Sequence, residues 1–287
     1  MMIIKNLAKT SMTDITKTFN EAFADYIIQF TTSEEYLQNR WNAAGVDYDL
    51  SFGIFSDDNL VGFIIHGIDQ WNGKETAFNI GTGVVPDHRG KRIVKKLYNH
   101  ALPILKEHGI EQCLLEVIQE NEKAIKAYES VGFKEERELI SFTYSLDTKG
   151  VVARLDDQIQ MKVDTDILSI DWDFVQSFWD FKPSWEHSIS AIMKNVNVCQ
   201  FLGLYKEGKL IGYAIFTPKT GYIFQFAIAK DERGKGFAKC LFQKLMTFSD
   251  KLVTINVDKR SEQTLNFLSA FGFKEFIKQY EMKKFPL

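Results

Sequence analysis

Three short segments of the first half of the chain recur, in the same order, in the second half. They are the strand-like segments around Gly62 and Gly212, the Arg-Gly-Lys tripeptides that begin at Arg89 and Arg233, and the Gly-Phe pairs at Gly132 and Gly272. The separation falls from 150 to 144 to 140 residues, as small loop deletions in a duplicated domain would produce. Because 287 residues suffice for two domains, we expect tandem copies over 1–146 and 151–287, joined by a linker at 147–150.

The same order of elements is expected in each copy. In the first copy the patterns predict a helical stretch over 13–43, strands over 49–56, 59–69 and 77–86, a helix over 90–109, a strand over 112–119, a short helix over 120–132 and a strand over 133–146. Paired strands followed by alternating helix and strand indicate a mixed α/β (α+β) domain.

Composition excludes several classes of function. A net charge of −3 argues against a broad basic surface for nucleic acid, and no apolar run is long enough to span a membrane. The N-terminus has no signal-peptide pattern, and three separated cysteines without a CxxC motif are typical of reduced thiols in the cytoplasm. The five histidines form no metal-binding pattern, so we expect no metal.

The segment from Val84 to Val94 combines an apolar strand end, a glycine-bearing basic turn and the start of a helix. The first amides of a helix have no intrahelical partner, and the helix dipole favours an anion there. Neither the Walker pattern nor GxGxxG is present. From the residues alone, a phosphate site and an ordinary strand-to-helix turn both stay open.

Two motifs carry a resemblance to the GCN5-related N-acetyltransferase (GNAT) family. The turn Arg233–Ala238 matches that family's Arg/Gln-x-x-Gly-x-Gly/Ala signature, and the first half contains its closing motif from Asn121 through Tyr128 to Gly132-Phe133. Residues 114–133 are also similar to the same segment of ribosomal-protein alanine N-acetyltransferases. The resemblance extends over nearly the whole chain and implies two tandem domains, each a twisted mixed sheet flanked by helices.

The resemblance further implies the ligands. Acetyl-CoA would lie between two splayed parallel strands as co-substrate, and a primary amine of a small molecule or peptide would enter from the opposite side. We therefore expect a cytoplasmic acetyltransferase without nucleic-acid, membrane or metal partners, and we leave a homodimer open. The residues that would hold acetyl-CoA are Val84, Val85, Arg89, Gly90, Lys91, Arg92, Ile93, Val94, Asn121 and Ala124.

Two side chains are candidates for catalysis. Attack of an amine on a thioester requires removal of a proton from the ammonium group and stabilisation of the leaving thiolate. Tyr128 matches the family's thiol-contacting tyrosine and is the candidate general acid; the alternative is a packed aromatic residue. Glu116, a lone carboxylate in an apolar strand, is the candidate base, with a structural hydrogen-bonding role as the alternative.

The two copies depart from the family pattern in different ways. In the first copy, Arg92 and Val94 replace the usual small residues of the turn. The second copy keeps the turn but has Leu268 where the first has Tyr128, so we expect catalysis in the first copy. Catalysis in the second copy and a non-catalytic acyl-CoA-binding sensor or scaffold remain alternatives. Candidates for the acceptor pocket are Phe23, Tyr26, Trp41, Asp69, Trp71 and Asn79.

Overall fold

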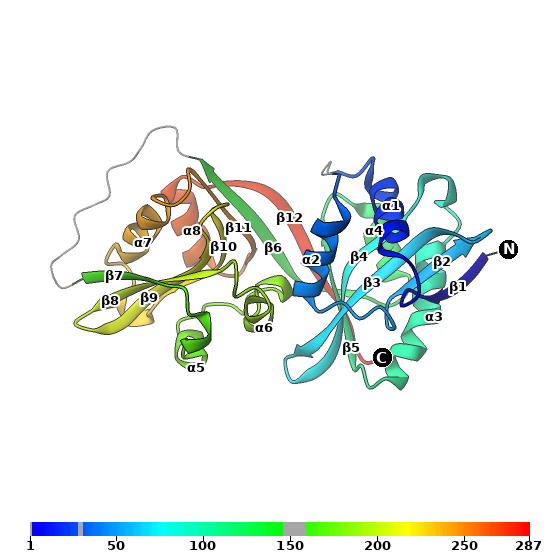
Figure 1. Cartoon of the computed structure of the whole chain (residues 1–287). Coiled ribbons are helices and arrows are strands. Elements are labelled where there is room, and N and C mark those ends of the chain that lie inside the picture. The colour runs from blue at the N-terminus through cyan, green and yellow to red at the C-terminus, as the bar shows by residue number, and fades with distance from the viewer. Residues whose placement is uncertain (1, 28–30, 146–158) are drawn as a thin grey trace. The chain divides into compact units, whose positions relative to one another are not determined.

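The computed structural model describes residues 2–27, 31–145 and 159–287 (Figure 1). The chain divides into two compact units: unit 1 comprises Met1–Arg137 and Gln279–Leu287, and unit 2 comprises Glu138–Lys278. Unit 1 is therefore built from two separate segments of the chain, which a contiguous division into 1–146 and 151–287 does not describe. The expected linker at 147–150 lies outside the described residues.

Unit 1 is a mixed sheet with helices on both faces. Its elements are β1 (Met2–Asn6), α1 (Met12–Phe23), α2 (Glu34–Ala44), β2 (Phe52–Ser56), β3 (Asn59–Trp71), β4 (Lys74–Val84), α3 (Ile93–Glu107), β5 (Gln112–Ile118), α4 (Glu122–Glu129), the start of β6 (Lys134–Ser145) and the end of β12 (Lys274–Lys284). The strand order is β1-β2-β3-β4-β5-β12, in which only β4 and β5 run parallel. The expected mixed α/β class is confirmed.

Alternating side chains of the central strands supply the cores of unit 1. Along β3, Ile64 faces a cluster with α3 and α4, whereas Phe63 and Ile65 face a second cluster with α1 and α2. Each helix closes its face with a buried stripe, for example Leu97, Tyr98 and Ala101 on α3.

The expected single helical stretch over 13–43 is wrong in detail, because two helices occupy it. Helix α1 ends at Phe23, and α2 starts only at Glu34, after Ser33 accepts a hydrogen bond from the Tyr36 amide. A serine in this capping position favours a new helix start over continuation of the preceding helix. The residues after α1 are thereby available to line the site described below.

Unit 2 repeats the plan of unit 1. It contains the end of β6, then β7 (Ile159–Asp164), α5 (Trp172–Gln176), α6 (Ile189–Met193), β8 (Gln200–Lys206), β9 (Lys209–Thr217), β10 (Tyr222–Ile228), α7 (Phe237–Leu245), β11 (Lys251–Asp258), α8 (Glu262–Phe271) and the start of β12. The strand order β6-β11-β10-β9-β8-β7 has one parallel pair, β10 with β11. The repeat expected from the sequence is therefore present in the fold.

Strands β6 and β12 each contribute to both units. Residues 139–145 of β6 pair with β11 in unit 2, although the strand begins in unit 1. Residues 279–284 of β12, the end of the described chain apart from the last three residues, pair antiparallel with β5 in unit 1. Met282 of β12 belongs to the buried core of unit 1. Each copy is thus completed by a strand from outside its contiguous sequence.

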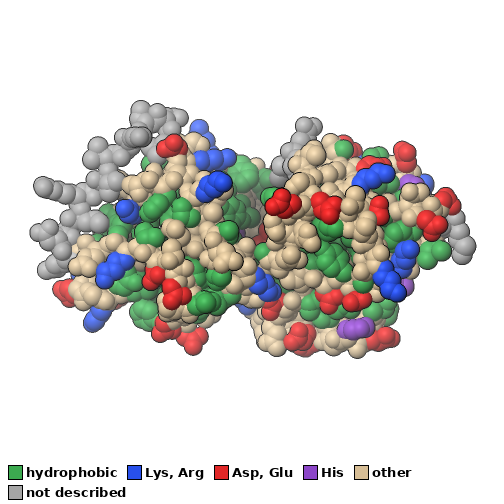
Figure 2. Space-filling model, viewed as in Figure 1, with side chains coloured by type: hydrophobic (Ala, Val, Ile, Leu, Met, Phe, Trp, Pro, Cys, Tyr) green, Lys and Arg blue, Asp and Glu red, His purple; other side chains and the backbone are tan. Residues whose placement is uncertain are grey.

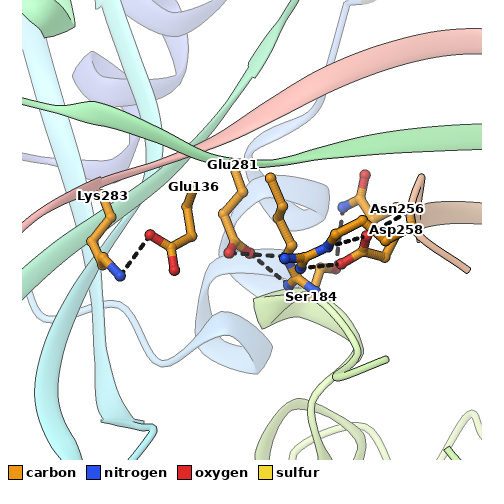
Figure 3. Close-up of polar contacts among 8 residues, drawn as sticks. Glu136, Ser184, Asn256, Asp258, Glu281 and Lys283 are labelled. Atoms are coloured by element: carbon orange, nitrogen blue, oxygen red, sulfur yellow. Dashed lines mark hydrogen bonds and ion pairs between the residues drawn. The ribbon is translucent and has the colours of Figure 1, made fainter. Parts of the chain in front are cut away.

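Two ion pairs hold this returning segment in unit 1 (Figure 3). Glu281 receives two hydrogen bonds from Arg137, at 3.0 and 2.8 Å, and both side chains are buried. Lys283 lies 2.6 Å from Glu136, but that pair is 32% and 44% exposed. Both pairs connect the same two segments, so they differ mainly in burial.

We expect Glu281→Ala to destabilise the protein by about 3–5 kcal/mol, because it leaves the Arg137 guanidinium buried without this partner. The control Lys283→Ala removes a half-exposed pair and should cost at most about 1 kcal/mol. Urea unfolding curves of both variants measure the difference. Equal midpoints would contradict the assigned role of the buried pair.

Surface charge is mixed on the face drawn in Figure 2. There, lysine and arginine side chains lie among acidic ones and form no single basic field. Among the described residues, no helix is both long enough and apolar enough to cross a membrane.

Candidate active site

The two parallel strands of unit 1 separate toward their carboxyl ends. Strands β4 and β5 pair from Thr76 with Gln112 to Asn79 with Leu115. An extra residue in β4, between Asn79 and Gly81, shifts the register against β3, a β-bulge that bends the strand. Beyond it, β4 remains paired with β3 and β5 with β12, so the strand ends diverge.

A cavity of about 1120 Å³ lies at this divergence. One wall is the end of β4 with the following turn and the start of α3; the other is the β5–α4 turn with α4. The predicted residues among its lining are Val84, Arg89, Gly90, Arg92, Ile93, Val94, Asn121, Ala124 and Tyr128. The structure thus brings together most of the predicted residues.

The turn before α3 exposes backbone amides. Gly90 and Arg92 both adopt left-handed conformations, with φ of 75° and 56°. Arg92 is the residue before the helix, and no side chain caps the helix at this end. The first amides of α3 therefore remain available to an anion. Arg92 adopts this conformation although it carries a Cβ, at a cost of about 1 kcal/mol relative to glycine.

The Arg89 side chain has a structural task. Its guanidinium donates to both carboxylate oxygens of Asp25, at 2.6 and 2.8 Å, and to the carbonyls of Ala22 and Val84. It thus ties the segment after α1 to the end of β4, and this hydrogen bond lowers the pKa of Asp25. Because these bonds occupy the guanidinium, we expect only the backbone of Arg89 to contact a ligand.

The second copy repeats this anchor with one difference: Arg89 donates to both oxygens of Asp25, whereas Arg233 donates to one oxygen of Asp180 and to Gln263 at 3.2 Å. Arg233 donates to Asp180 at 2.6 Å, to the carbonyl of Phe178 at 2.6 Å and to that of Ile228 at 3.1 Å. The lysines of the two tripeptides match as well: each donates to a backbone carbonyl four residues earlier, at 2.9 Å. The Arg-Gly-Lys tripeptide therefore builds the turn in both copies.

Basic side chains at the cavity distinguish the copies. In unit 1 the cavity is lined by His88, Arg92, Lys95 and Lys123. The corresponding positions of the second copy, which also line a cavity, are Glu232, Gly236, Lys239 and Gln263. Glu120 and Glu122 also line the cavity of unit 1, so the excess of basic side chains lies at the start of α3, where Arg92 and Lys95 favour an anion electrostatically.

Tyr128 reaches the cavity of unit 1 from α4. Its side chain is buried, with the residue 8% exposed, and lies edge-on to the ring of Tyr98. Burial raises the pKa of Tyr128 to about 12, and hydrogen bonds with Thr82 and Asn79 oppose that rise. The phenol therefore keeps its proton at neutral pH and can donate it.

Asn121 orders the turn beside Tyr128. Its side-chain oxygen accepts a hydrogen bond from the Ala124 amide at 3.2 Å, which caps α4. Tyr26, from the segment after α1, hydrogen-bonds with Asn121 and also lines the cavity. Of the acceptor candidates, Phe23 and Tyr26 face the cavity, whereas Trp41 and Trp71 are buried in the fold.

Three predicted residues lie outside the cavity lining. Val85 is buried in the core, and the Lys91 ammonium donates to the Asp87 carbonyl. Glu116 is half-buried in β5, directly across from Glu281 of β12. Its neighbours Leu115 and Val117 belong to the core that contains Tyr128, so Glu116 points to the opposite face of the sheet.

Sequence inspection did not recognise the polar partners of Tyr128. Asn79 donates to the hydroxyl oxygens of Thr82 and Tyr98, each at 2.7 Å. Asn79 had been an acceptor candidate, but it lies beneath the cavity. A comparison of the two halves could have found them. The positions 144 residues after Asn79, Thr82 and Tyr98 hold the apolar residues Ile223, Phe226 and Phe242.

The cavity of unit 2 is smaller, about 530 Å³, and largely aromatic. It is lined by the turn at Gly234 and Gly236 and by side chains that include Phe226 and Phe267. Leu268, the counterpart of Tyr128, is fully buried in the apolar core. The described side chains of unit 2 therefore place no hydroxyl where unit 1 has its candidate acid.

The family model described as "Acetyltransferase (GNAT) family" matches residues 15–133 and again 165–273. The chain therefore belongs to the GNAT family and carries two copies of its domain. A tandem GNAT protein from the clavulanic acid biosynthesis pathway matches with a TM-score of 0.75 over 99% of this chain and 98% of that chain, at 14% identity, which shows the shared fold.

Two curated relatives match parts of the chain. Streptothricin acetyltransferase of Streptomyces lavendulae is 38% identical over 78 residues, which are 27% of this chain and 40% of that protein. N-alpha-acetyltransferase 30 of Schizosaccharomyces pombe is 27% identical over 120 residues, 42% of this chain and 72% of that protein. The family and these relatives support acyl transfer as the class of reaction.

Proposed function

We propose that the protein transfers an acetyl group from acetyl-CoA to a primary amine of a small molecule or peptide, in unit 1. The observation that carries the proposal is the cavity of about 1120 Å³, where uncapped helix amides, basic side chains and the protonated Tyr128 converge. The amides of α3 and the side chains of Arg92, Lys95 and Lys123 suit the phosphates of the donor. The apolar interior suits its thioester arm.

The proposed chemistry uses both faces of the sheet. An amine that approaches from the Glu116 side loses a proton to that carboxylate, and its nitrogen then attacks the thioester carbonyl carbon. The carbon–sulfur bond breaks, and the departing thiolate takes the Tyr128 proton. The nitrogen of the intermediate then loses its second proton, which restores the Tyr128 phenol through solvent. The products are an amide and the CoA thiol, and the proton held by Glu116 is released to solvent.

Unit 2 is a candidate for donor binding without turnover. Its turn has glycine at both left-handed positions, Gly234 and Gly236, and no side chain caps α7. The alternative assignment of catalysis to this copy is disfavoured by Leu268, which cannot supply a proton. A single active unit is accordingly proposed.

The test is a turnover assay of the full chain with acetyl-CoA and an amine panel. The panel pairs a free-amine antibiotic with its N-acetylated form, and a peptide bearing a free N-terminus with its blocked form, because the names of the two relatives point to these classes. We expect thiol release with one free amine and none with its blocked partner. Thiol release that does not depend on a free amine would contradict amine acetylation.

A further inference from the structure

A chain of hydrogen bonds lies beneath the Tyr128 hydroxyl in unit 1. Asn79, only 6% exposed, uses its side-chain nitrogen to donate to Thr82 and to Tyr98. Thr82 in turn hydrogen-bonds with Tyr128. Asn79 also hydrogen-bonds with Tyr128 itself, so it is linked to the candidate acid both directly and through the Thr82 hydroxyl.

The direction of these bonds is set by Asn79. An amide nitrogen can only donate, so the Thr82 oxygen that receives its hydrogen keeps its own proton for another acceptor. If that proton goes to the Tyr128 oxygen, the Tyr128 proton points out of the network. Because Tyr128 lines the cavity, this orientation presents the phenolic proton to the thioester site.

A histidine of β3 borders this network of described side chains without a hydrogen bond to it. His66 stands directly opposite Asn79 in the β3–β4 ladder and is fully buried. Its Nδ1 donates to the Leu50 carbonyl at 2.7 Å, and burial lowers its pKa to about 4, so the ring stays neutral. This neutral, fixed ring packs edge-on against Tyr98 and adds no charge to the network.

The second copy has lost the whole network together. The counterparts of His66, Asn79, Thr82, Tyr98 and Tyr128 are Phe216, Ile223, Phe226, Phe242 and Leu268. Phe216 and Ile223 face each other across β9 and β10 as His66 and Asn79 do across β3 and β4. All five replacements are apolar and pack in one core. The five residues occur together in unit 1 and are replaced together in unit 2, which is consistent with one shared function.

We propose that Asn79 is a positioning residue for acetyl transfer: acting directly and through Thr82, it orients the Tyr128 hydroxyl so that its proton faces the cavity. The inference rests on the proposed function of unit 1. The inference assigns a specific role to Asn79, which neither lines the cavity nor takes part in the reaction itself.

The test is a double-mutant cycle with Asn79→Asp and Tyr128→Phe in the full chain. A carboxylate of the same shape accepts instead of donating, which reverses the bonds and turns the Tyr128 proton inward. We expect Asn79→Asp alone to lower kcat by roughly 10- to 100-fold with KM for acetyl-CoA unchanged. In the Tyr128→Phe background it should have no further effect. An equal loss in both backgrounds would overturn the proposal, as would an unchanged kcat.

Thr82 provides a second pair of variants in case the buried carboxylate prevents folding. Thr82→Ser keeps the hydroxyl and should retain kcat, whereas Thr82→Val removes it and should lower kcat, by less than Asn79→Asp does because the direct Asn79 bond remains. The chemical shift of isotope-labelled tyrosine Cζ, assigned through Tyr128→Phe, reports the Tyr128 hydrogen bond without any turnover. A Tyr128 signal that does not move in Asn79→Asp would overturn the network even if the wild type proved to have another activity.

Discussion

Replacement of Tyr128 by phenylalanine is expected to lower kcat by about 10²–10⁴-fold, the usual contribution of general acid catalysis, with little change in KM for acetyl-CoA. The ring remains packed against Tyr98 and Phe133, so donor binding should be nearly preserved, and the lost hydrogen bonds should cost only about 1 kcal/mol of stability. Only the proton for the leaving thiolate is lost. Steady-state kinetics and melting curves of the two proteins measure both effects.

Tyr213→Phe is the matched control in unit 2. Tyr213 is also a fully buried, hydrogen-bonded tyrosine, and burial raises its pKa as well. Its replacement should cost stability but leave kcat unchanged. A wild-type kcat in Tyr128→Phe, or a loss of stability alone, would identify Tyr128 as a core aromatic residue.

Replacement of Gly90 by proline is expected to weaken acetyl-CoA binding at least about tenfold, roughly 1.4 kcal/mol. Gly90 has φ of 75°, whereas proline is restricted to φ near −65°, so the turn must rearrange. Proline also removes one backbone amide from the proposed phosphate site. Calorimetric titration with acetyl-CoA gives the dissociation constant.

Gly234→Pro makes the same change in unit 2, where φ is 74°. Neither glycine would place a Cβ within 4 Å of another atom, so the two substitutions differ only in the copy that they disturb. Unchanged affinity for acetyl-CoA in a folded Gly90→Pro protein would indicate that acetyl-CoA binds at the Gly234 turn of unit 2.

Most of the fold could be predicted because local patterns determine it. Alternating apolar residues marked β2, β3 and β4, and the glycine turns marked the starts of α3 and α7. The repeat showed the tandem plan, since both turns carry Arg-Gly-Lys and both arginines donate to the carbonyl five residues earlier.

The remaining features depend on contacts between distant segments. The end of β12 pairs with β5, about 160 residues earlier in the chain. No local sequence pattern predicts which distant strand will pair with the edge of a sheet. Likewise, a single-residue bulge in β4 and the fold of α3 bring Asn79, Thr82 and Tyr98 together. Sequence spacing alone could not place these polar side chains beneath Tyr128.

The exchange of strands also determines how the copies must be tested. A fragment of residues 151–287 would lack β6, which pairs with β11, and would expose the end of β12 that belongs to unit 1. Loss of activity in such a fragment would report misfolding as readily as a missing acid. Point substitutions in the full chain avoid this ambiguity.

We propose that catalysis, and the donor binding that serves it, reside in unit 1. Steady-state kinetics of full-length Gly234→Pro, compared with Gly90→Pro under the same conditions, test it most directly. We expect Gly234→Pro to keep the wild-type kcat and KM for acetyl-CoA, whereas Gly90→Pro should raise KM at least about tenfold. Loss of turnover in a folded Gly234→Pro protein, together with wild-type kinetics in Gly90→Pro, would contradict it and assign the chemistry to unit 2.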